Sequence, residues 1–210
     1  MRDKVRTFLE HLYQEGVEHD AKPMQSRRKR WNLEPDAAAL VNVVLQAMGA
    51  RRVLEIGTSN GYSTIWLADA IQPSGGSVLS ADIDGDIQVE AARNLDAAGV
   101  ANCVELRQAD GGVVLREATD ASLDAILLDS KRSHYLDWWP QMVRALRPGG
   151  LLAVDNVLSH ASEVANFRSA VESDARFIST VVAVGKGELL AVKQFSPESV
   201  VSLPGRTTPS

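Results

Sequence analysis

Hydrophobic positions along the chain follow two alternating patterns. Short apolar runs predict buried strands, at residues 52–56, 77–82, 104–107, 123–129 and 151–155. Between them, apolar positions at helical spacing predict helices, at residues 61–71, 85–98, 112–118, 135–146 and 162–174. Strands that alternate with helices in this way form βαβ units around a parallel sheet.

The pattern changes after the last of these helices. Two strand-like runs, 177–184 and 188–195, are joined by Gly185-Lys186-Gly187 and predict an antiparallel hairpin at the edge of the sheet. The sequence therefore predicts a doubly wound, Rossmann-like α/β fold with a seven-stranded, mainly parallel sheet and an antiparallel edge strand.

The two ends of the chain differ from this core. Residues 1–20 and 36–48 have helical spacing and flank a polar, basic stretch. We expect residues 1–49 to form helices that cap or cover the main unit, 50–195, within one domain. Residues 196–210, which hold Pro, Ser, Thr and Gly, are predicted to be a flexible tail.

Composition narrows the class of protein. The 210 residues are 45% apolar and 23% charged, as in a soluble globular domain. No apolar run approaches the roughly 20 residues that cross a bilayer, and charges interrupt the N-terminus, so a cytoplasmic location and no membrane partner are expected. The single cysteine, Cys103, excludes an internal disulfide and is interpreted as structural.

Net charge bears on the partners. The formal charge of -5 argues against a broad nucleic-acid surface. The basic run Arg27–Arg30 opposes that trend, and its simplest interpretation is a solvated surface segment.

The first candidate site is the turn after the first predicted strand. Gly57 and Gly61 allow a ligand to approach the backbone closely, and the helix that follows presents free N–H groups. Asp82 and Asp110 follow the next two strands, where an acid can accept hydrogen bonds from a ribose hydroxyl or an adenine amino group. Each feature alone is most simply a tight turn or a loop end, but together they favour a nucleoside ligand.

This motif resembles a known family. Glu55-x-Gly57-x-x-x-Gly61, with Asp82 and Asp110 after it, is similar to class I S-adenosylmethionine-dependent methyltransferases. Within them, residues 50–195 resemble the cation-dependent catechol and caffeoyl-CoA O-methyltransferases. The resemblance implies a homodimer and a set of cofactor-binding residues, namely Glu55, Gly57, Thr58, Ser59, Gly61, Tyr62, Ser63, Asp82, Ile83, Asp110, Gly111 and Asp129.

A candidate metal site follows two later strands. Asp129 ends one apolar strand, and Asp155 and Asn156 end the next. Neighbouring parallel strands bring such residues together, and two carboxylates with an amide oxygen suit Mg²⁺ or another divalent cation. The alternative is that Asp155 caps the following helix and Asn156 forms a turn. Most of the weight for a metal comes from the family resemblance.

Three residues are candidates for catalysis, namely Asp129, Lys131 and Arg132. In the family that this chain resembles, a lysine three residues after the first metal aspartate is assigned as the general base. Here Arg132 holds that position, and arginine stays protonated. Lys131 serves if the loop is shifted; otherwise the metal suffices, or Arg132 binds an anionic group of the substrate. His134 and His160 are further candidates, for which surface or capping roles are favoured.

The acceptor side is marked by large side chains. Trp31, Trp138, Trp139 and Met24 are candidates for an aromatic pocket, and for Trp139 packing between the cap and the main unit is the favoured alternative. The favoured function is methyl transfer from S-adenosylmethionine to a hydroxyl of a small catechol-like acceptor. The alternatives are methylation of a hydroxyuridine in tRNA, and a nucleoside-binding module without catalysis.

Overall fold

The computed structural model describes residues 3–25 and 28–195. The helices are α1 (Asp3–Asp20), α2 (Pro35–Ala47), α3 (Tyr62–Ile71), α4 (Gly85–Ala98), α5 (Gly111–Glu117), α6 (Tyr135–Ala145) and α7 (Ala161–Ser173). The strands are β1 (Arg52–Ile56), β2 (Ser77–Asp82), β3 (Val104–Gln108), β4 (Leu123–Leu128), β5 (Leu146–Val154), β6 (Phe177–Val182) and β7 (Glu188–Lys193). The predicted tail and Arg27 of the basic run lie outside the described residues.

The seven strands form one sheet in the order β3-β2-β1-β4-β5-β7-β6. Strands β1 to β5 pair parallel with one another, and β7 pairs antiparallel with both β5 and β6. The predicted doubly wound fold and its terminal hairpin are confirmed, with β6 as the outermost strand. Chain order reverses direction across the sheet between β1 and β4, which is where ligands bind in folds of this kind.

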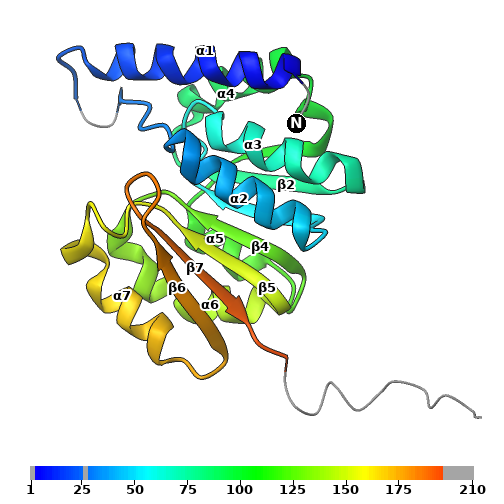
Figure 1. Cartoon of the computed structure of the whole chain (residues 1–210), viewed down its shortest axis with the longest axis vertical. Helices are drawn as coiled ribbons and strands as arrows, with labels where there is room; N and C mark the ends of the chain where they lie inside the picture. Colours follow the sequence, from blue (N-terminus) through cyan, green and yellow to red (C-terminus); the bar gives the residue numbers. More distant parts are fainter. Residues whose placement is uncertain (1–2, 26–27, 196–210) are drawn as a thin grey trace, which may run out of the picture.

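Helices cover both faces of the sheet (Figure 1). On one face, α1, α2, α3 and α4 share a core with inward side chains of the central strands. On the other face, α5, α6 and α7 enclose a second core that includes Trp139 and Phe167. The strands read as continuous apolar runs because both of their faces are buried in this way.

The N-terminal helices belong to the first of these layers. Helix α1 contacts α3 and α4, and α2 packs against α3. The segment between α1 and α2 is held by Asp20, whose carboxylate accepts hydrogen bonds from Arg30 N (2.7 Å) and Trp31 N (2.9 Å). Residues 29–31 of this segment reach the carboxyl edge of the sheet.

One strand begins earlier than the pattern predicts. β5 starts at Leu146, which pairs with Leu123, and the regular register resumes where Leu151 pairs with Ala125. The intervening Arg147-Pro148-Gly149-Gly150 stretch bulges out of the ladder, and Arg147 binds the carboxylate of Asp124. The sequence marks this stretch as a helix stop, but its return to the sheet depends on that tertiary ion pair.

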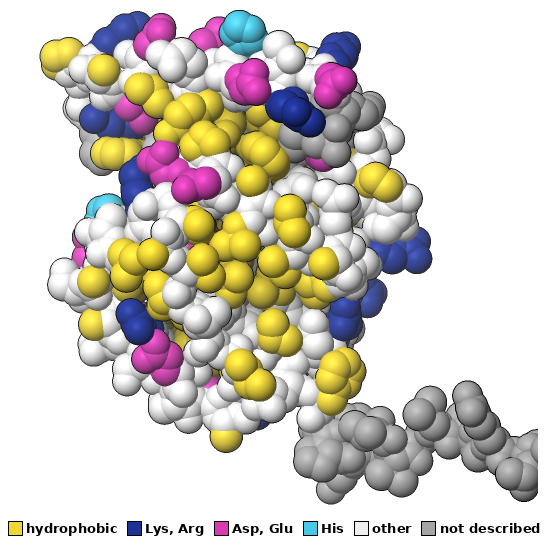
Figure 2. Space-filling view, viewed as in Figure 1, with side chains coloured by type: hydrophobic (Ala, Val, Ile, Leu, Met, Phe, Trp, Pro, Cys, Tyr) yellow, Lys and Arg dark blue, Asp and Glu magenta, His cyan; other side chains and the backbone are white. Residues whose placement is uncertain are grey.

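The face seen in Figure 2 carries apolar side chains beneath α1 and over α2, β6 and β7. Exposed apolar residues on these last three elements include Val43, Ile178 and Val192. Within the described part of the chain, no helix has both the length and the apolar character needed to span a membrane.

Candidate active site

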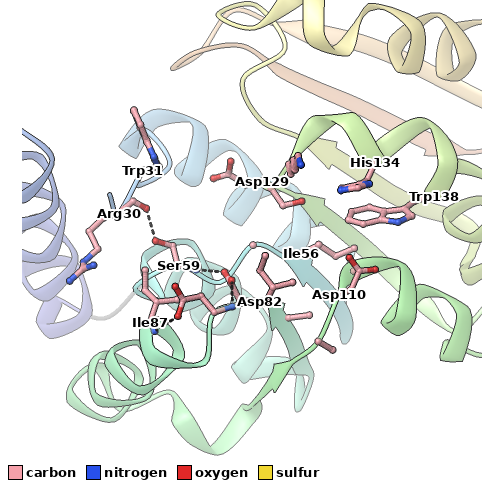
Figure 3. Close-up of a pocket in the computed structure, with 18 of the residues that line it drawn as sticks. Arg30, Trp31, Ile56, Ser59, Asp82, Ile87, Asp110, Asp129, His134 and Trp138 are labelled. Carbon is pink, nitrogen blue, oxygen red and sulfur yellow. Dashed lines mark hydrogen bonds between the residues drawn. The ribbon is translucent and has the colours of Figure 1, made fainter. Parts of the chain in front are cut away.

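A pocket of about 270 Å³ lies at the carboxyl edge of the sheet (Figure 3). Its walls come from the turns after β1 and β2, the end of β3, the loop after β4, and residues 29–31. Many of the sequence-predicted residues line it, namely Gly57, Ser59, Asp82, Ile83, Asp110, Gly111, Asp129 and Lys131. The structure therefore brings together residues from four successive strand ends.

Gly57 allows the ends of β1 and β4 to meet. Its φ is +108°, and a Cβ added there would lie 2.0 Å from the carbonyl oxygen of Asp129. Backbone hydrogen bonds hold this contact, with Gly57 N donating to Ala81 O (2.9 Å) and Asp129 N to Ile56 O (3.1 Å). A side chain at position 57 would push apart the two segments that carry the site.

Glu55 lies beneath the pocket and not in its wall. Its side chain is fully buried, and its carboxylate accepts hydrogen bonds from Ser63 Oγ (2.6 Å), Thr64 Oγ1 (2.5 Å) and Ser80 Oγ (2.5 Å). Burial raises the pKa of Glu55 to about 7, against the opposing effect of those hydroxyl donors. The residue ties β1 to α3 and β2, which gives it a supporting role, and its predicted contact with a cofactor stays a prediction.

Other residues of the predicted cofactor set also face the protein interior. Thr58 is fully buried and its hydroxyl lies 2.7 Å from that of Ser80. Gly61 has its α-carbon against Ala91, and Ser63 points to Glu55. Tyr62 lines a separate pocket between α1 and α3. The first turn of α3 packs inward, so these side chains support the glycine turn, and their contact with a cofactor stays a prediction.

The acids after β2 and β3 lie in the pocket wall. Asp82 accepts hydrogen bonds from Ser59 N (3.1 Å) and Asp84 N (3.0 Å), which fixes its carboxylate beside the glycine turn. Asp110 caps α5 by accepting from Gly112 N (2.9 Å), and it also lines the pocket. Each acid thus holds a turn or a helix end, as the simplest interpretation of the sequence predicts, and also lies where a ligand can reach it.

Aromatic rings form opposite sides of the pocket (Figure 3). His134 stacks on Trp138, with centroids 5.4 Å apart and planes at 20°. Trp31 approaches from the connecting segment, is 54% exposed, and has Lys29 Nζ 4.9 Å from its ring centroid. The pocket therefore offers flat apolar surfaces to a planar ligand.

Two of the predicted aromatic-pocket residues lie elsewhere. Met24 does not line the pocket. Trp139 packs, as predicted, but against Phe167 and Phe177 and not between the N-terminal helices and the main unit. Its position on α6 turns it toward the opposite core, which the sequence pattern alone did not specify.

Asp129, Asp155 and Asn156 converge next to the pocket. The Asn156 amide Nδ2 donates to Asp155 Oδ2 (2.6 Å) and to Asp129 Oδ1 (3.4 Å), so it bridges the two carboxylates. Asn156 has a φ of +68°, in the left-handed region that asparagine tolerates, and is 8% exposed. Burial and mutual repulsion raise the pKa of Asp129, and burial raises that of Asp155.

This cluster fits a divalent cation. The carboxylate of Asp155 is buried, that of Asp129 is half-buried at the pocket wall, and the Asn156 N–H donor lies between them, where a cation would be held by both. Turning the amide over would present its Oδ1 and complete a set of three hard oxygen ligands. In the described residues, no three acidic, histidine or cysteine side chains form a ready-made ligand group, so the set depends on the amide.

Sequence reasoning missed the charged residues that the terminal hairpin brings to this cluster. Glu188 is fully buried, and burial together with Asp155 and Asp129 raises its pKa to about 9. Lys186 lowers the pKa of both aspartates and pairs with Glu34 at 3.1 Å. The available signal was the hairpin register, because a strand antiparallel to β5 must start beside the residues that end β5.

The loop after β4 directs two of the candidate proton acceptors to different places. Lys131 lines the pocket, whereas Arg132 lies outside it and pairs with Glu163 at 3.5 Å. Tyr135 holds this loop, since its hydroxyl accepts from Ser130 N (2.7 Å) and donates to Ser130 O (2.9 Å). His160 occupies the N-cap position of α7, with its Nδ1 2.9 Å from Ser159 Oγ.

The fold and the pocket together define a doubly wound α/β protein with a ligand site at its topological switch point. The family model described as O-methyltransferase matches residues 5–194, so the chain belongs to the O-methyltransferase family.

Individual relatives agree with this assignment. The chain is 29% identical over 130 residues to a catechol O-methyltransferase from Niastella koreensis, covering 60% of this chain and 58% of that protein. It is 28% identical over 162 residues to caffeoyl-CoA O-methyltransferase 1 from Zea mays, covering 73% and 62%. The match thus spans about three fifths of the length of these relatives.

A solved structure shows the same fold. The O-methyltransferase from Bacillus cereus in complex with S-adenosylhomocysteine superposes with a TM-score of 0.76 and 24% identity. The superposition covers 90% of this chain and 91% of that one, so the whole arrangement of helices and strands is shared.

Proposed function

We propose that this protein transfers a methyl group from S-adenosylmethionine to a hydroxyl oxygen of a small catechol-like acceptor, aided by a divalent cation. The observation that carries the proposal is that the pocket and the candidate cation cluster lie side by side. The pocket beside Gly57 and Asp82 adjoins, through Asp129, the cluster of Asp155 and Asn156. A methyl donor in the first would face an oxygen held at the second.

The chain's own residues have distinct roles in this proposal. Asp82 accepts hydrogen bonds from the ribose, and Asp110 faces the adenine beside the His134–Trp138 stack. Gly57 lets the end of β1 approach the backbone of Asp129, which brings the donor pocket and the cation cluster side by side. The protein thereby holds donor and acceptor in line, which supplies much of the acceleration of a displacement reaction.

Asp129, Asp155 and Asn156 would hold the cation. A phenol with a pKa of about 10 is mostly protonated at neutral pH, and a bound cation favours its reactive anion and fixes its position. Lys131 lies in the pocket wall and is the candidate to accept the proton, since Arg132 is held by Glu163 and keeps its charge.

The basic segment supports a small acceptor over tRNA. Arg30 pairs with Glu90, and Lys29 lies over Trp31, so two of the basic side chains of this run contact the protein's own residues. A surface that neutralises phosphates would present several free cations to solvent.

The test is a methyl-transfer assay with S-adenosylmethionine, catechol and Mg²⁺. The proposal predicts a methylated catechol whose formation stops with a chelator and with Asp155→Asn. Asp120→Asn, on an exposed acid that pairs with Arg144 far from the pocket, is the matched control and should retain the rate. Binding of S-adenosylhomocysteine without transfer to any catechol would favour a non-catalytic nucleoside-binding role. Strong transfer to a tRNA that carries a hydroxyuridine, with steep salt dependence, would favour the RNA alternative.

A further inference from the structure

Glu188 is a buried acid with no donor to satisfy it. Its side chain is 0% exposed, and among the described residues no N–H or hydroxyl group donates to either carboxylate oxygen; the polar group that faces it is another carboxyl, that of Asp155. An unsatisfied buried carboxylate is costly, so a residue of this kind calls for an explanation.

The register of the sheet sets Glu188 beside the candidate cation cluster. Val154 of β5 pairs with Leu189 of β7, so the next residues outward, Asp155 and Glu188, lie opposite each other. Opposite residues of antiparallel strands project to the same side of a sheet. The carboxyl groups of Glu188 and Asp155 are consequently close neighbours, and Asp129 also acts on Glu188 through its charge.

The basic residues nearby are engaged with other acids. Lys186 pairs with Glu34 at 3.1 Å, and Arg132 pairs with Glu163 at 3.5 Å. In the described part of the chain, no salt bridge includes Asp129, Asp155 or Glu188. Two buried carboxyl groups, Asp155 and Glu188, and the half-buried Asp129 therefore share one region in which Lys186 and Arg132 act through their charge but form no ion pair with them.

We propose that Glu188 is a positioning residue of the cation site, whose carboxylate lies behind Asp155 and strengthens the binding of a divalent cation. This inference rests on the proposed function, because it assumes that Asp129, Asp155 and Asn156 hold the cation. Groups behind the direct ligands orient them and add to the local charge, and their removal commonly weakens metal binding by about 10–100-fold. The same group, left without a cation, lowers the stability of the folded chain.

The experiment is a calorimetric titration of Mn²⁺ alone into the wild type, Glu188→Gln, Glu188→Asp and the control Glu172→Gln. Glu172 is an exposed acid on α7 that pairs with Arg168, so its loss removes a charge away from the site. We expect Glu188→Gln to weaken Mn²⁺ binding by about 10–100-fold. Glu188→Asp, which keeps the charge, should retain more of the affinity, and Glu172→Gln all of it.

A second readout separates positioning from packing. In the presence of a chelator, Glu188→Gln should raise the midpoint of thermal unfolding, because the Gln amide can donate a hydrogen bond to the Asp155 carboxylate while preserving side-chain size. Binding of S-adenosylhomocysteine should be unchanged in every variant, which shows that the fold is intact.

The outcomes distinguish the two proposals. Wild-type affinity for Mn²⁺ in Glu188→Gln would overturn this inference and leave the proposed function standing. No Mn²⁺ binding by the wild type would overturn both the cation in the proposed function and the role of Glu188.

Discussion

At the scale of single residues, the site depends on how closely two backbone segments approach. Gly57 combines a positive φ with a contact that a Cβ would turn into a clash. Gly99, which ends α4, also has a positive φ, but its added Cβ would meet nothing within 4 Å. Substituting each glycine by alanine therefore separates two destabilising effects, the strain of a positive φ and the clash of an added Cβ.

This comparison gives the first prediction. Gly99→Ala should destabilise the fold by about 1 kcal/mol, the scale of a left-handed conformation in a residue with a side chain. Gly57→Ala should cost about 3 kcal/mol or more, since overpacking is added to that strain, and should abolish binding of S-adenosylmethionine. Urea unfolding and calorimetry check both effects. Equal losses of stability in the two variants would contradict the close approach of β1 and β4.

Residue identity alone did not predict which polar groups face the ligand. Asp82 and Asp110 could be assigned to the pocket because they follow strands at its edge. Glu55 and Ser63 are also polar residues of the predicted cofactor set, but their side chains hydrogen-bond to each other inside the protein. The difference arises from the direction in which α3 leaves the glycine turn, which spacing does not encode.

At the scale of elements, the loop between β4 and α6 decides where the basic residues point. Tyr135 fixes this loop through both backbone groups of Ser130. As a result, Lys131 faces the pocket, and Arg132 turns toward Glu163 on α7. The two adjacent residues have the same charge, but only Lys131 lines the pocket, so substituting each in turn tests which of them takes part in the reaction.

We expect Lys131→Ala to slow methyl transfer by about 100-fold, the lower range for loss of an acid–base group. Arg132→Ala should have a much smaller effect on the maximal rate, because it removes an ion pair at the rim. Steady-state kinetics with saturating donor and acceptor measure both. A larger loss of rate in Arg132→Ala than in Lys131→Ala would contradict the roles assigned here.

Element types followed from the sequence more securely than element ends. The apolar runs of β1, β2 and β4 are bounded by polar or glycine residues, and both kinds of signal agree there. The early start of β5 depends on Arg147 binding Asp124, a contact between segments far apart in sequence. The place of Glu188 depends on the register between β5 and β7. The Gly185-Lys186-Gly187 turn predicted that the chain reverses there, but not which residues of β5 would pair with β7.

At the scale of the whole molecule, the carboxyl edge of the sheet concentrates buried acids. Glu55 and Glu188 are both fully buried, and burial raises their pKa values from 4.5 to about 7 and about 9. Acids with lowered pKa values, such as Asp124 and Asp174, lie elsewhere and titrate below their ordinary value of 3.8. The two groups of acids therefore act on stability in different ranges of pH.

The sign of the effect follows from linkage. A raised pKa means that the folded chain holds these protons more tightly than the unfolded chain. The resulting stabilisation is complete below pH 4.5 and is lost as the pH rises through about 7 for Glu55 and about 9 for Glu188. With a chelator present, unfolding free energy should fall between pH 5 and 9, by about 1 kcal/mol per pH unit for each group that titrates.

Urea unfolding at several pH values measures this dependence. Mg²⁺ should restore much of the lost stability at high pH, because it binds the ionised form of the cluster. Glu188→Gln should flatten the upper part of the profile. Stability of the cation-free protein that stays constant or rises from pH 5 to 9 would contradict the raised pKa values.

The central claim is that a methyl donor and a cation occupy adjoining sites at this edge of the sheet. A crystal grown with S-adenosylhomocysteine and Mn²⁺, recorded with anomalous scattering, tests both positions in one measurement. The account predicts the nucleoside beside Gly57 and Asp82, and an anomalous peak in contact with Asp129, Asp155 and Asn156. A nucleoside bound elsewhere, or a peak absent from those three side chains at saturating Mn²⁺, would contradict it.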